Sequence, residues 1–285
     1  MSVSKKTYRQ SADKIHDELL HLYDDIYLPK PADPEQAWTR FLTALRARKQ
    51  VTVQNTRSLK LFVSAAAGIL LLIGLSVLFH LNKEVTISCR NAQNILTTLP
   101  DGSTVKLNAS SYIKYKKSGW KKNRIVFLNG EAFFTVKKGR RFQVNTSNGK
   151  IVVMGTSFNV FSRQKNLSVV CKTGKVLVEA SNSVILVPGM RAMLERNRTL
   201  KSEEANIEHA TAWQHGEFWY NNVSLTDVFA EIERQFDVVI KCSGIENRKY
   251  SGYFNIQSLQ NSLTGVCTPM QLHFKQESKK IFIIY

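Results

Sequence analysis

Histidines, cysteines and isolated acids are the residues of this chain that could do catalytic chemistry, and their spacing does not assemble a catalytic set. His209 and His215 lie six positions apart around Trp213, which does not place two metal ligands on one helical face. Glu131 is an isolated acid after Gly130, and we interpret it as a turn or strand-edge residue. The sequence contains no nucleophile-elbow, P-loop, zinc-protease or dinucleotide-binding motif. We expect no enzyme activity, no cofactor and no metal site.

The cysteines are dispersed and form no C-x-x-C pair, which argues against zinc and thioredoxin-like redox sites. They are Cys89, Cys171, Cys242 and Cys267. Cys242 and Cys267 would share one small domain, where either a disulfide or buried free thiols would fit.

One long apolar stretch organises the rest of the chain. Leu61–Leu81 reads LFVSAAAGILLLIGLSVLFHL and contains no Asp, Glu, Lys or Arg. As a helix it would be about 32 Å long, enough to cross the hydrocarbon core of a bilayer. A signal peptide would not follow some 60 residues of chain. We predict a single transmembrane helix over residues 61–81.

Charge sets the expected orientation of this helix. Basic residues gather on its N-terminal side without any acid among them, at Arg46, Arg48, Lys49, Arg57 and Lys60. Because basic segments stay in the cytoplasm, residues 1–60 should be cytoplasmic and residues 82–285 should be exported to the other side of the membrane. The net charge of +18 divides into +4 before the helix and +14 after it. Most of the excess would therefore lie outside the cytoplasm, so we expect no direct binding of nucleic acid.

The N-terminal 60 residues predict two short amphipathic helices, over residues 11–27 and 34–48. In the second helix, four apolar residues recur at helical spacing: Trp38, Phe41, Leu42 and Leu45. Two such helices bury too little surface for a robust core. The apolar face could await a partner protein, or the two helices could pack on each other.

Residues 82–200 predict an all-β domain, a sandwich or a compact solenoid. Short alternating segments run from Thr104 to Leu194, with Asn129-Gly130 among the expected turns between Arg124–Leu128 and Ala132–Val136. After a polar linker near residues 201–208, the pattern changes. Residues 201–285 predict a small α+β domain in the order β-α-β-β-α-β-β.

Five stretches of the middle segment closely resemble the FecR-type anti-sigma regulators. They are LPDGSTVKLNASSYIKY (Leu99–Tyr115), VFLNGEAFFTV (Val126–Val136), FQVNTSNGKIVVMGTSFNVF (Phe142–Phe161), KTGKVLVEA (Lys172–Ala180) and LVPGMRAML (Leu186–Leu194). The stretch Trp213–Ile240 is similar to the C-terminal domain that accompanies this family in Bacteroidota, which is like the short N-terminal module of secretins and TonB-dependent receptors. The resemblance covers roughly residues 80–285.

This resemblance implies a function. The cytoplasmic segment would bind an extracytoplasmic-function sigma factor, and the periplasmic part would contact the signalling domain of a TonB-dependent outer-membrane transducer. Regulated proteolysis, by proteases that process the chain, would carry the signal inward. We expect the sigma factor to bind at Trp38, Phe41, Leu42 and Leu45. We expect transducer contacts to be organised by Trp213, Phe218, Tyr250, Tyr253 and Phe254, with the strand Tyr250–Phe254 offering an edge for β-augmentation.

The resemblance also marks one bond for covalent chemistry, because some family members cut themselves between Gly and Thr. Here the bond would be Gly155-Thr156, with the Thr hydroxyl attacking the preceding carbonyl. A tight turn between two strands is the alternative explanation of the same residues. For the whole chain, the alternative function is a membrane-anchored periplasmic protein that binds carbohydrate or cell wall.

Overall fold

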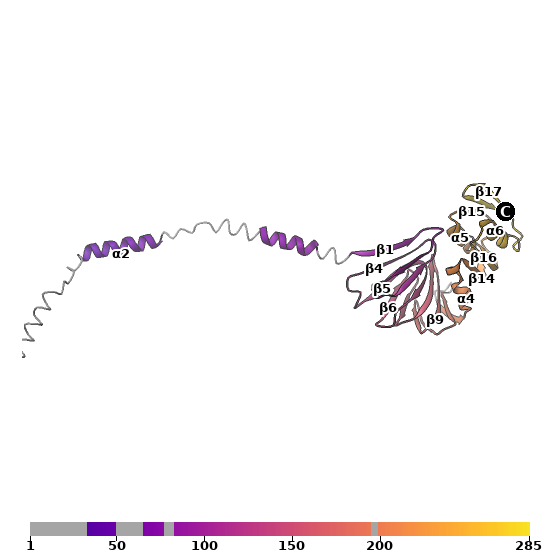
Figure 1. Cartoon of the computed structure of the whole chain (residues 1–285), viewed down its shortest axis with the longest axis horizontal. Coiled ribbons are helices and arrows are strands. Elements are labelled where there is room, and N and C mark those ends of the chain that lie inside the picture. The colour runs from indigo at the N-terminus through magenta and orange to yellow at the C-terminus, as the bar shows by residue number, and fades with distance from the viewer. Residues whose placement is uncertain (1–32, 50–64, 77–82, 195–198) are drawn as a thin grey trace, which may run out of the picture. The chain divides into compact units, whose positions relative to one another are not determined.

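The structure is a computed structural model that describes residues 33–49, 65–76, 83–194 and 199–285 (Figure 1). The chain forms two compact units, Met1–Leu72 and Ile73–Tyr285, and each is described by itself. The predicted helix over residues 11–27 lies outside the described residues.

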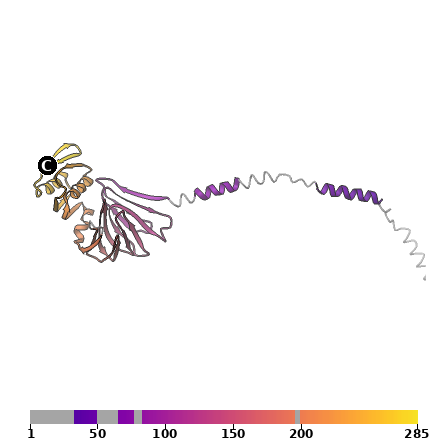
Figure 2. The same ribbon diagram turned by 180° about the vertical axis from the view of Figure 1, so that it is seen from behind.

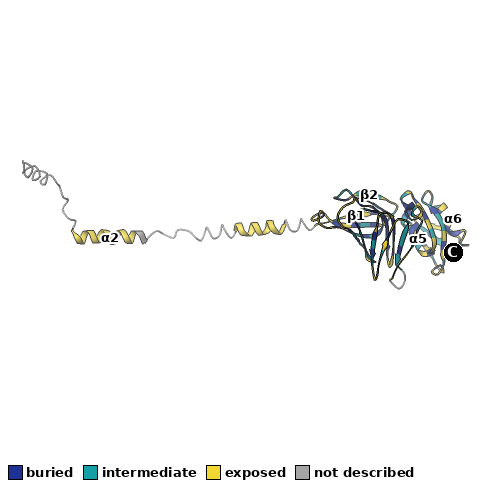
Figure 3. Cartoon of the chain, turned by 90° about the horizontal axis from the view of Figure 1, so that it is seen from below, coloured by how far each residue is buried: buried dark blue, intermediate teal, exposed yellow. Residues whose placement is uncertain are grey.

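In the N-terminal unit, α2 (Pro34–Lys49) confirms the helix predicted from Pro34 onward. Proline suits the first helical position because its missing N–H needs no partner there. The Asp33 carboxylate accepts a hydrogen bond from the Glu35 N–H at 3.2 Å, which caps the first turn. Residues 34–47 are exposed, and Figure 3 colours this part of α2 yellow.

Residues 65–76 are helical and exposed. No helix among the described residues is long and apolar enough to cross a membrane. The predicted span over residues 61–81 extends past both ends of this helix, into positions outside the description, so the span stays a prediction.

The second unit begins with a β domain whose thirteen strands form one sheet. The sheet curls nearly into a barrel, and all of its strand pairs but β5–β6 are antiparallel (Figure 1). The strands are β1 (Glu84–Cys89), β2 (Ile95–Thr98), β3 (Thr104–Leu107), β4 (Ser111–Lys116), β5 (Arg124–Thr135), β6 (Phe142–Asn145), β7 (Lys150–Val153), β8 (Ser157–Arg163), β9 (Asn166–Thr173), β10 (Val176–Glu179), β11 (Ser183–Leu186), β12 (Met190–Leu194) and β13 (Leu200–Glu204).

The long strand β5 corrects one sequence prediction. Asn129-Gly130 is not a turn, since β5 continues through it. Gly130 takes a φ of +106°, which lets the strand bend instead of reversing. The half before the bend pairs with β4 and β6, and the half after it pairs with β3 and β8. The strands on either side of the bend form the two layers of the curled sheet, and β5 runs through both layers.

Alternating apolar residues from both layers fill the core of the β domain. Phe134 stacks on Phe158 with ring centroids 5.2 Å apart, and Phe142 meets Phe134 edge-on at 6.2 Å. Trp120 closes one end by packing against Tyr115 and Phe142. All of these rings are buried, and the contact between Phe134 and Phe142 joins the two layers.

The C-terminal domain confirms the predicted order β-α-β-β-α-β-β. Its elements are β14 (Glu217–Ser224), α5 (Leu225–Phe236), β15 (Val239–Cys242), β16 (Lys249–Asn255), α6 (Leu259–Cys267), β17 (Phe274–Ser278) and β18 (Ile281–Ile284). β14 and β16 form a two-stranded sheet, and β15, β18 and β17 form a three-stranded one. The helices and sheets of this domain gather at the C-terminal end of the chain (Figure 2), and their apolar side chains form a second buried core.

The predicted polar linker near residues 201–208 is partly wrong, because Leu200–Glu204 forms β13 and pairs with β12. The helix α4 (Ile207–Thr211) and the 3-10 turn η1 (Ala212–His215) follow it. The side chain of Asn206 caps α4 by accepting the His209 N–H. All four cysteines are free thiols, which answers the open question on Cys242 and Cys267.

We predict that Gly130→Ala strongly destabilises the β domain. An added Cβ would lie 2.8 Å from the Cα of Ser111, on a backbone that L-residues rarely adopt. The control is Gly119→Ala, because Gly119 also has a positive φ but open space around it. Urea unfolding should show a loss of about 3 kcal/mol for Gly130→Ala and about 1 kcal/mol for Gly119→Ala. Equal losses would show that β5 is not fixed at this bend.

Candidate functional site

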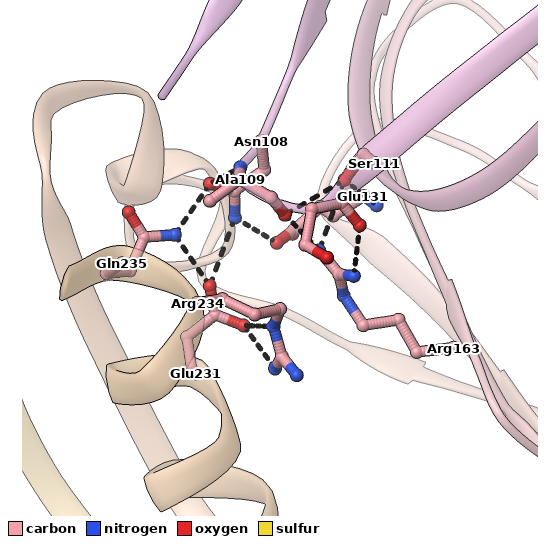
Figure 4. A network of polar contacts seen from close by, with 9 residues as sticks. Asn108, Ala109, Ser111, Glu131, Arg163, Glu231, Arg234 and Gln235 are labelled. Carbon is pink, nitrogen blue, oxygen red and sulfur yellow. Dashed lines mark hydrogen bonds and ion pairs between the residues drawn. The ribbon is translucent and has the colours of Figure 1, made fainter. Parts of the chain in front are cut away.

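The most distinctive site of the second unit is a buried polar network where α5 packs on the β domain (Figure 4). The β domain contributes Asn108 after β3, Glu131 from β5 and Asn159 from β8, all buried. The helix α5 contributes Glu231 and Gln235, which lie one turn apart on its buried side. Burying this many polar groups costs free energy of folding unless they form hydrogen bonds with one another.

Glu131 is the centre of the network. Its Oε2 accepts a hydrogen bond from Asn108 Nδ2 and its Oε1 accepts one from Asn159 Nδ2, both at 2.8 Å. Its backbone N–H donates to Ser111 Oγ at 3.0 Å, and its carbonyl accepts the Asn108 N–H. The interpretation of Glu131 as a turn or strand-edge residue is therefore wrong, because it lies buried within β5 and its carboxylate and main chain are hydrogen-bonded to neighbouring residues.

The two asparagines extend the network to the C-terminal domain. Asn159 Oδ1 accepts the indole N–H of Trp213 at 3.0 Å, and Asn108 Oδ1 accepts Gln235 Nε2 at 2.8 Å. Gln235 also donates to Glu231 Oε1 at 2.7 Å. Each asparagine thus uses its NH₂ on Glu131 and its oxygen on the neighbouring domain, which fixes how the domains dock.

Two arginines flank the carboxylates. Arg234 donates to Glu231 Oε2 at 2.6 Å, while Arg163 donates to the carbonyls of Ala109 and Ser110. Burial, reinforced by the negative charge of Glu231, raises the pKa of Glu131 to about 7. Burial also lowers the pKa of Arg163. The interface therefore contains a carboxyl group that can change charge near neutral pH.

A cleft of about 440 Å³ lies beside this network and is lined by Arg163, Arg234, Asn91, Asn129, Gln164 and Glu233 among others. Asn91 Nδ2 donates to Asp237 Oδ1 at 3.2 Å and the Ala92 N–H donates to the Arg234 carbonyl, so the β1–β2 turn also contacts α5. Within the described residues, no group of His, Cys, Asp and Glu is arranged to hold a metal ion.

The residues predicted to organise transducer contacts occupy two different environments. Trp213, Phe218, Tyr250 and Phe254 are buried in the core of the C-terminal domain, where they can support a binding surface but cannot form it. Tyr253 is only half-buried and lies against Trp219, with ring centroids 4.5 Å apart. The exposed aromatic surface of β14 and β16 is therefore Trp219 with Tyr253, and His209 stacks on Trp219 at 4.3 Å.

The predicted sigma-binding residues remain together on α2. Their side chains are 62% exposed for Trp38, 51% for Phe41, 37% for Leu42 and 46% for Leu45. Trp38 and Phe41 stack with centroids 5.5 Å apart.

The predicted self-cleavage bond lies in the connection between β7 and β8. Gly155 has a φ of +154°, and a Cβ there would lie 2.6 Å from the Cα of Lys138. Thr156 is buried, and its hydroxyl has no hydrogen-bond partner within the described part of the chain. The observed tight connection fits a structural role for Gly155, while the unpartnered hydroxyl next to its carbonyl leaves the cleavage prediction open.

We predict that Glu131→Gln reduces the pH dependence of stability. Because the pKa of Glu131 rises from 4.5 to about 7 on folding, its stabilising contribution is complete below about pH 4.5 and is lost as the pH rises toward 7. The free energy of unfolding should fall by about 1–3 kcal/mol over this window in the wild type, and less in Glu131→Gln. Glu231, Arg163 and Arg234 face the same site and remain in both proteins.

The measurement is urea unfolding at a series of pH values. The exposed Glu217→Gln is the matched control and should keep the wild-type slope. An unchanged slope in Glu131→Gln would show that Glu131 does not titrate on folding.

Comparison with known proteins agrees with this architecture. Residues 85–177 match the family model described as FecR protein, and residues 217–283 match the one described as FecR, C-terminal. Two crystal structures of a protein described as an anti-sigma factor, from Parabacteroides distasonis ATCC 8503, are similar at 26% sequence identity. The structure at 2.50 Å has a TM-score of 0.67 and covers 71% of this chain and 99% of that one. The structure at 1.65 Å has a TM-score of 0.66 and covers 70% and 98%.

No curated protein matches the chain. The two family models lie in the same order as the two domains, and the similar structures span both domains. The chain belongs to the FecR-type anti-sigma factor family.

Proposed function

We propose that this protein is a single-pass inner-membrane anti-sigma factor that relays a signal from a TonB-dependent outer-membrane transducer to an extracytoplasmic-function sigma factor. Family membership supports the anti-sigma role and implies a sigma factor as partner. The membrane topology is argued from the apolar run and the charges of the chain, and the transducer is what the resemblance to the family implies.

The observation that carries the sigma-binding part is the exposed apolar face of α2. Trp38, Phe41, Leu42 and Leu45 lie at positions i, i+3, i+4 and i+7, so they share one side of the helix. A soluble helix rarely leaves such a stripe in water, and a groove in a partner protein is its usual cover. We assign this face to the sigma factor.

The apolar run over residues 61–81 supports the membrane topology, and the helix of residues 65–76 lies inside it. On this topology residues 82–285 are periplasmic, where they can meet the transducer. Trp219 and Tyr253 offer exposed aromatic contacts, and β14 and β16 pair only with each other among the described strands. Each therefore keeps one edge for β-augmentation. Proteases that process the chain would complete the relay.

We predict that Trp38→Ala weakens binding of the sigma factor by at least about 2 kcal/mol, because a central tryptophan of a helix-in-groove contact is a typical hot spot. The measurement is co-purification of the full chain with the sigma factors of its source organism, followed by titration of the captured one. Gln36→Ala is the matched control, since Gln36 lies on the opposite face of α2 and should leave the affinity unchanged. Equal affinity of the wild type and Trp38→Ala would place the sigma contact elsewhere.

We also propose that the bond between Gly155 and Thr156 is cut by the chain itself. The Thr156 hydroxyl would attack the Gly155 carbonyl carbon, the amide C–N bond would break, and an ester with a free Thr156 amine would form. Water would then hydrolyse the ester to a Gly155 carboxylate and the original hydroxyl. β8 remains paired with β5 on the other side of the cut, so the two fragments should stay together until denatured.

We predict two fragments on a denaturing gel for the wild type, one intact band for Thr156→Ala, and two fragments again for Thr156→Ser, which restores the hydroxyl. Native size-exclusion chromatography should give one species for all three. A single intact wild-type band after membrane insertion would reject the cleavage and leave the tight-turn explanation.

A further inference from the structure

We propose that a cluster of basic side chains on the β domain binds the anionic phospholipid headgroups next to the predicted span. We call this cluster the basic rim. It consists of Lys116, Lys117, Lys121, Lys122, Lys137, Lys138, Arg140 and Arg141, all exposed. The inference rests on the proposed function only in requiring that residues 61–81 cross a membrane.

The first half of the basic rim lies beside the start of β1. Glu84, the first residue of β1, is paired with Lys116, the last residue of β4. Glu84 follows the predicted span by three residues, which reach about 10 Å when extended. The connection from β4 to β5, with Lys117, Lys121 and Lys122, must therefore lie close to the bilayer surface whenever the span is inserted.

The second half of the basic rim lies at the same end of the sheet. Arg124, the first residue of β5, is paired in register with Phe142, the first residue of β6. Arg124 Nη1 also donates to the Lys137 carbonyl at 3.0 Å and to Asp101 Oδ2 at 2.8 Å. Buried Arg124 thus holds the β5–β6 connection, with Lys138, Arg140 and Arg141, next to the β4–β5 connection.

The two connections that form the basic rim carry positive charges and no negative ones. Residues 116–124 and 136–142 contain no acid. Of the acids that pairing brings to this end, Asp101 is bound to Arg124, and Glu84 faces Lys116. Because the Debye length is about 8 Å at physiological salt, charges this close to a bilayer act on its headgroups.

Two further features suit a membrane surface. Met154 is 66% exposed, and its carbonyl accepts the Gly139 N–H at 2.8 Å, so an apolar side chain accompanies the basic ones. Trp120 packs against Tyr115 and Phe142, which fixes the loop that bears Lys117, Lys121 and Lys122. The charges are therefore presented on a rigid support.

Connectivity favours lipid over a protein as the partner. The C-terminal domain packs at Glu131, Asn108 and Asn159, beyond the bend of β5, whereas the basic rim surrounds the first residue of that strand. The rim is thus not covered by the C-terminal domain, and Glu84, which pairs with Lys116 of the rim, can lie no more than about 10 Å from the last residue of the predicted span.

The test uses the full chain in lipid nanodiscs, with Trp120 as a native reporter inside the rim. Discs contain phosphatidylcholine and phosphatidylglycerol in fixed proportion, with bromine on the acyl chains of only one of them. The measured quantity is tryptophan fluorescence, and the contribution of Trp120 is the difference in fluorescence between the wild type and Trp120→Phe. We expect brominated phosphatidylglycerol to quench Trp120 more than brominated phosphatidylcholine does, with the difference lost at about 1 M salt.

The rim variant carries Lys117, Lys121 and Lys122 each changed to Glu and should lose this difference. The matched control carries the same change at Lys165, Lys201 and Lys279, which lie outside the rim, and should keep it. Hydrogen exchange of residues 117–123 and 137–141 provides a second readout without any substitution, and exchange should be slower in discs with phosphatidylglycerol than in pure phosphatidylcholine.

Equal quenching by both lipids together with unchanged exchange would overturn the inference. A chain that fails to co-purify with the discs would instead reject the membrane topology of the proposed function, so the two failures are distinguishable.

Discussion

The hydrogen bonds from Asn108 and Asn159 to the Glu131 carboxylate are the interaction on which the arrangement of the second unit depends. Each asparagine has one oxygen left, and these oxygens accept Gln235 and Trp213 of the C-terminal domain. Removing any member would leave a buried donor or acceptor without a partner, a cost comparable to a large part of a domain's stability. Docking of the two domains is therefore specific in position as well as favourable.

Strand β5 connects this interface to the rest of the domain. It begins at Arg124, which fixes both connections of the basic rim, bends at Gly130, and immediately supplies Glu131 to the interface. A displacement of the C-terminal domain by a bound partner would act on β5, whose first half pairs with β4, the strand that also pairs with β1. On the proposed topology, this path would link a contact made by the C-terminal domain to the part of the chain that leads to the proposed span over residues 61–81.

The sequence predicted the elements of the fold better than the site. Turn residues and alternation located most strands and the complete order of the C-terminal domain, since these signals are local. The Asn129-Gly130 prediction failed because the same dipeptide serves a tight turn or a bend, and only pairing with β3, β4, β6 and β8 decides between them. Leu200–Glu204 has polar residues because it is an edge strand, which makes it look like a linker.

The polar network could not be predicted because its members are far apart in sequence, and each alone resembles a surface residue. One signal was present: Glu231 and Gln235 flank the apolar stripe of α5 one turn apart, as a buried polar pair on a docked helix would. Among the aromatic residues, burial separates Trp213, which donates into the network, from Trp219, which is exposed. Sequence pattern alone treats the two tryptophans alike.

The most direct test of domain coupling is a double-mutant cycle between Asn159→Ala and Trp213→Phe, with the free energy of unfolding of the full chain measured for all four proteins. Trp213→Phe keeps an aromatic ring and removes the N–H that Asn159 Oδ1 accepts. If this bond locks the two domains, the two changes should be non-additive by about 1 kcal/mol or more. Additivity within about 0.3 kcal/mol would contradict the account, because the domains would then dock without the network.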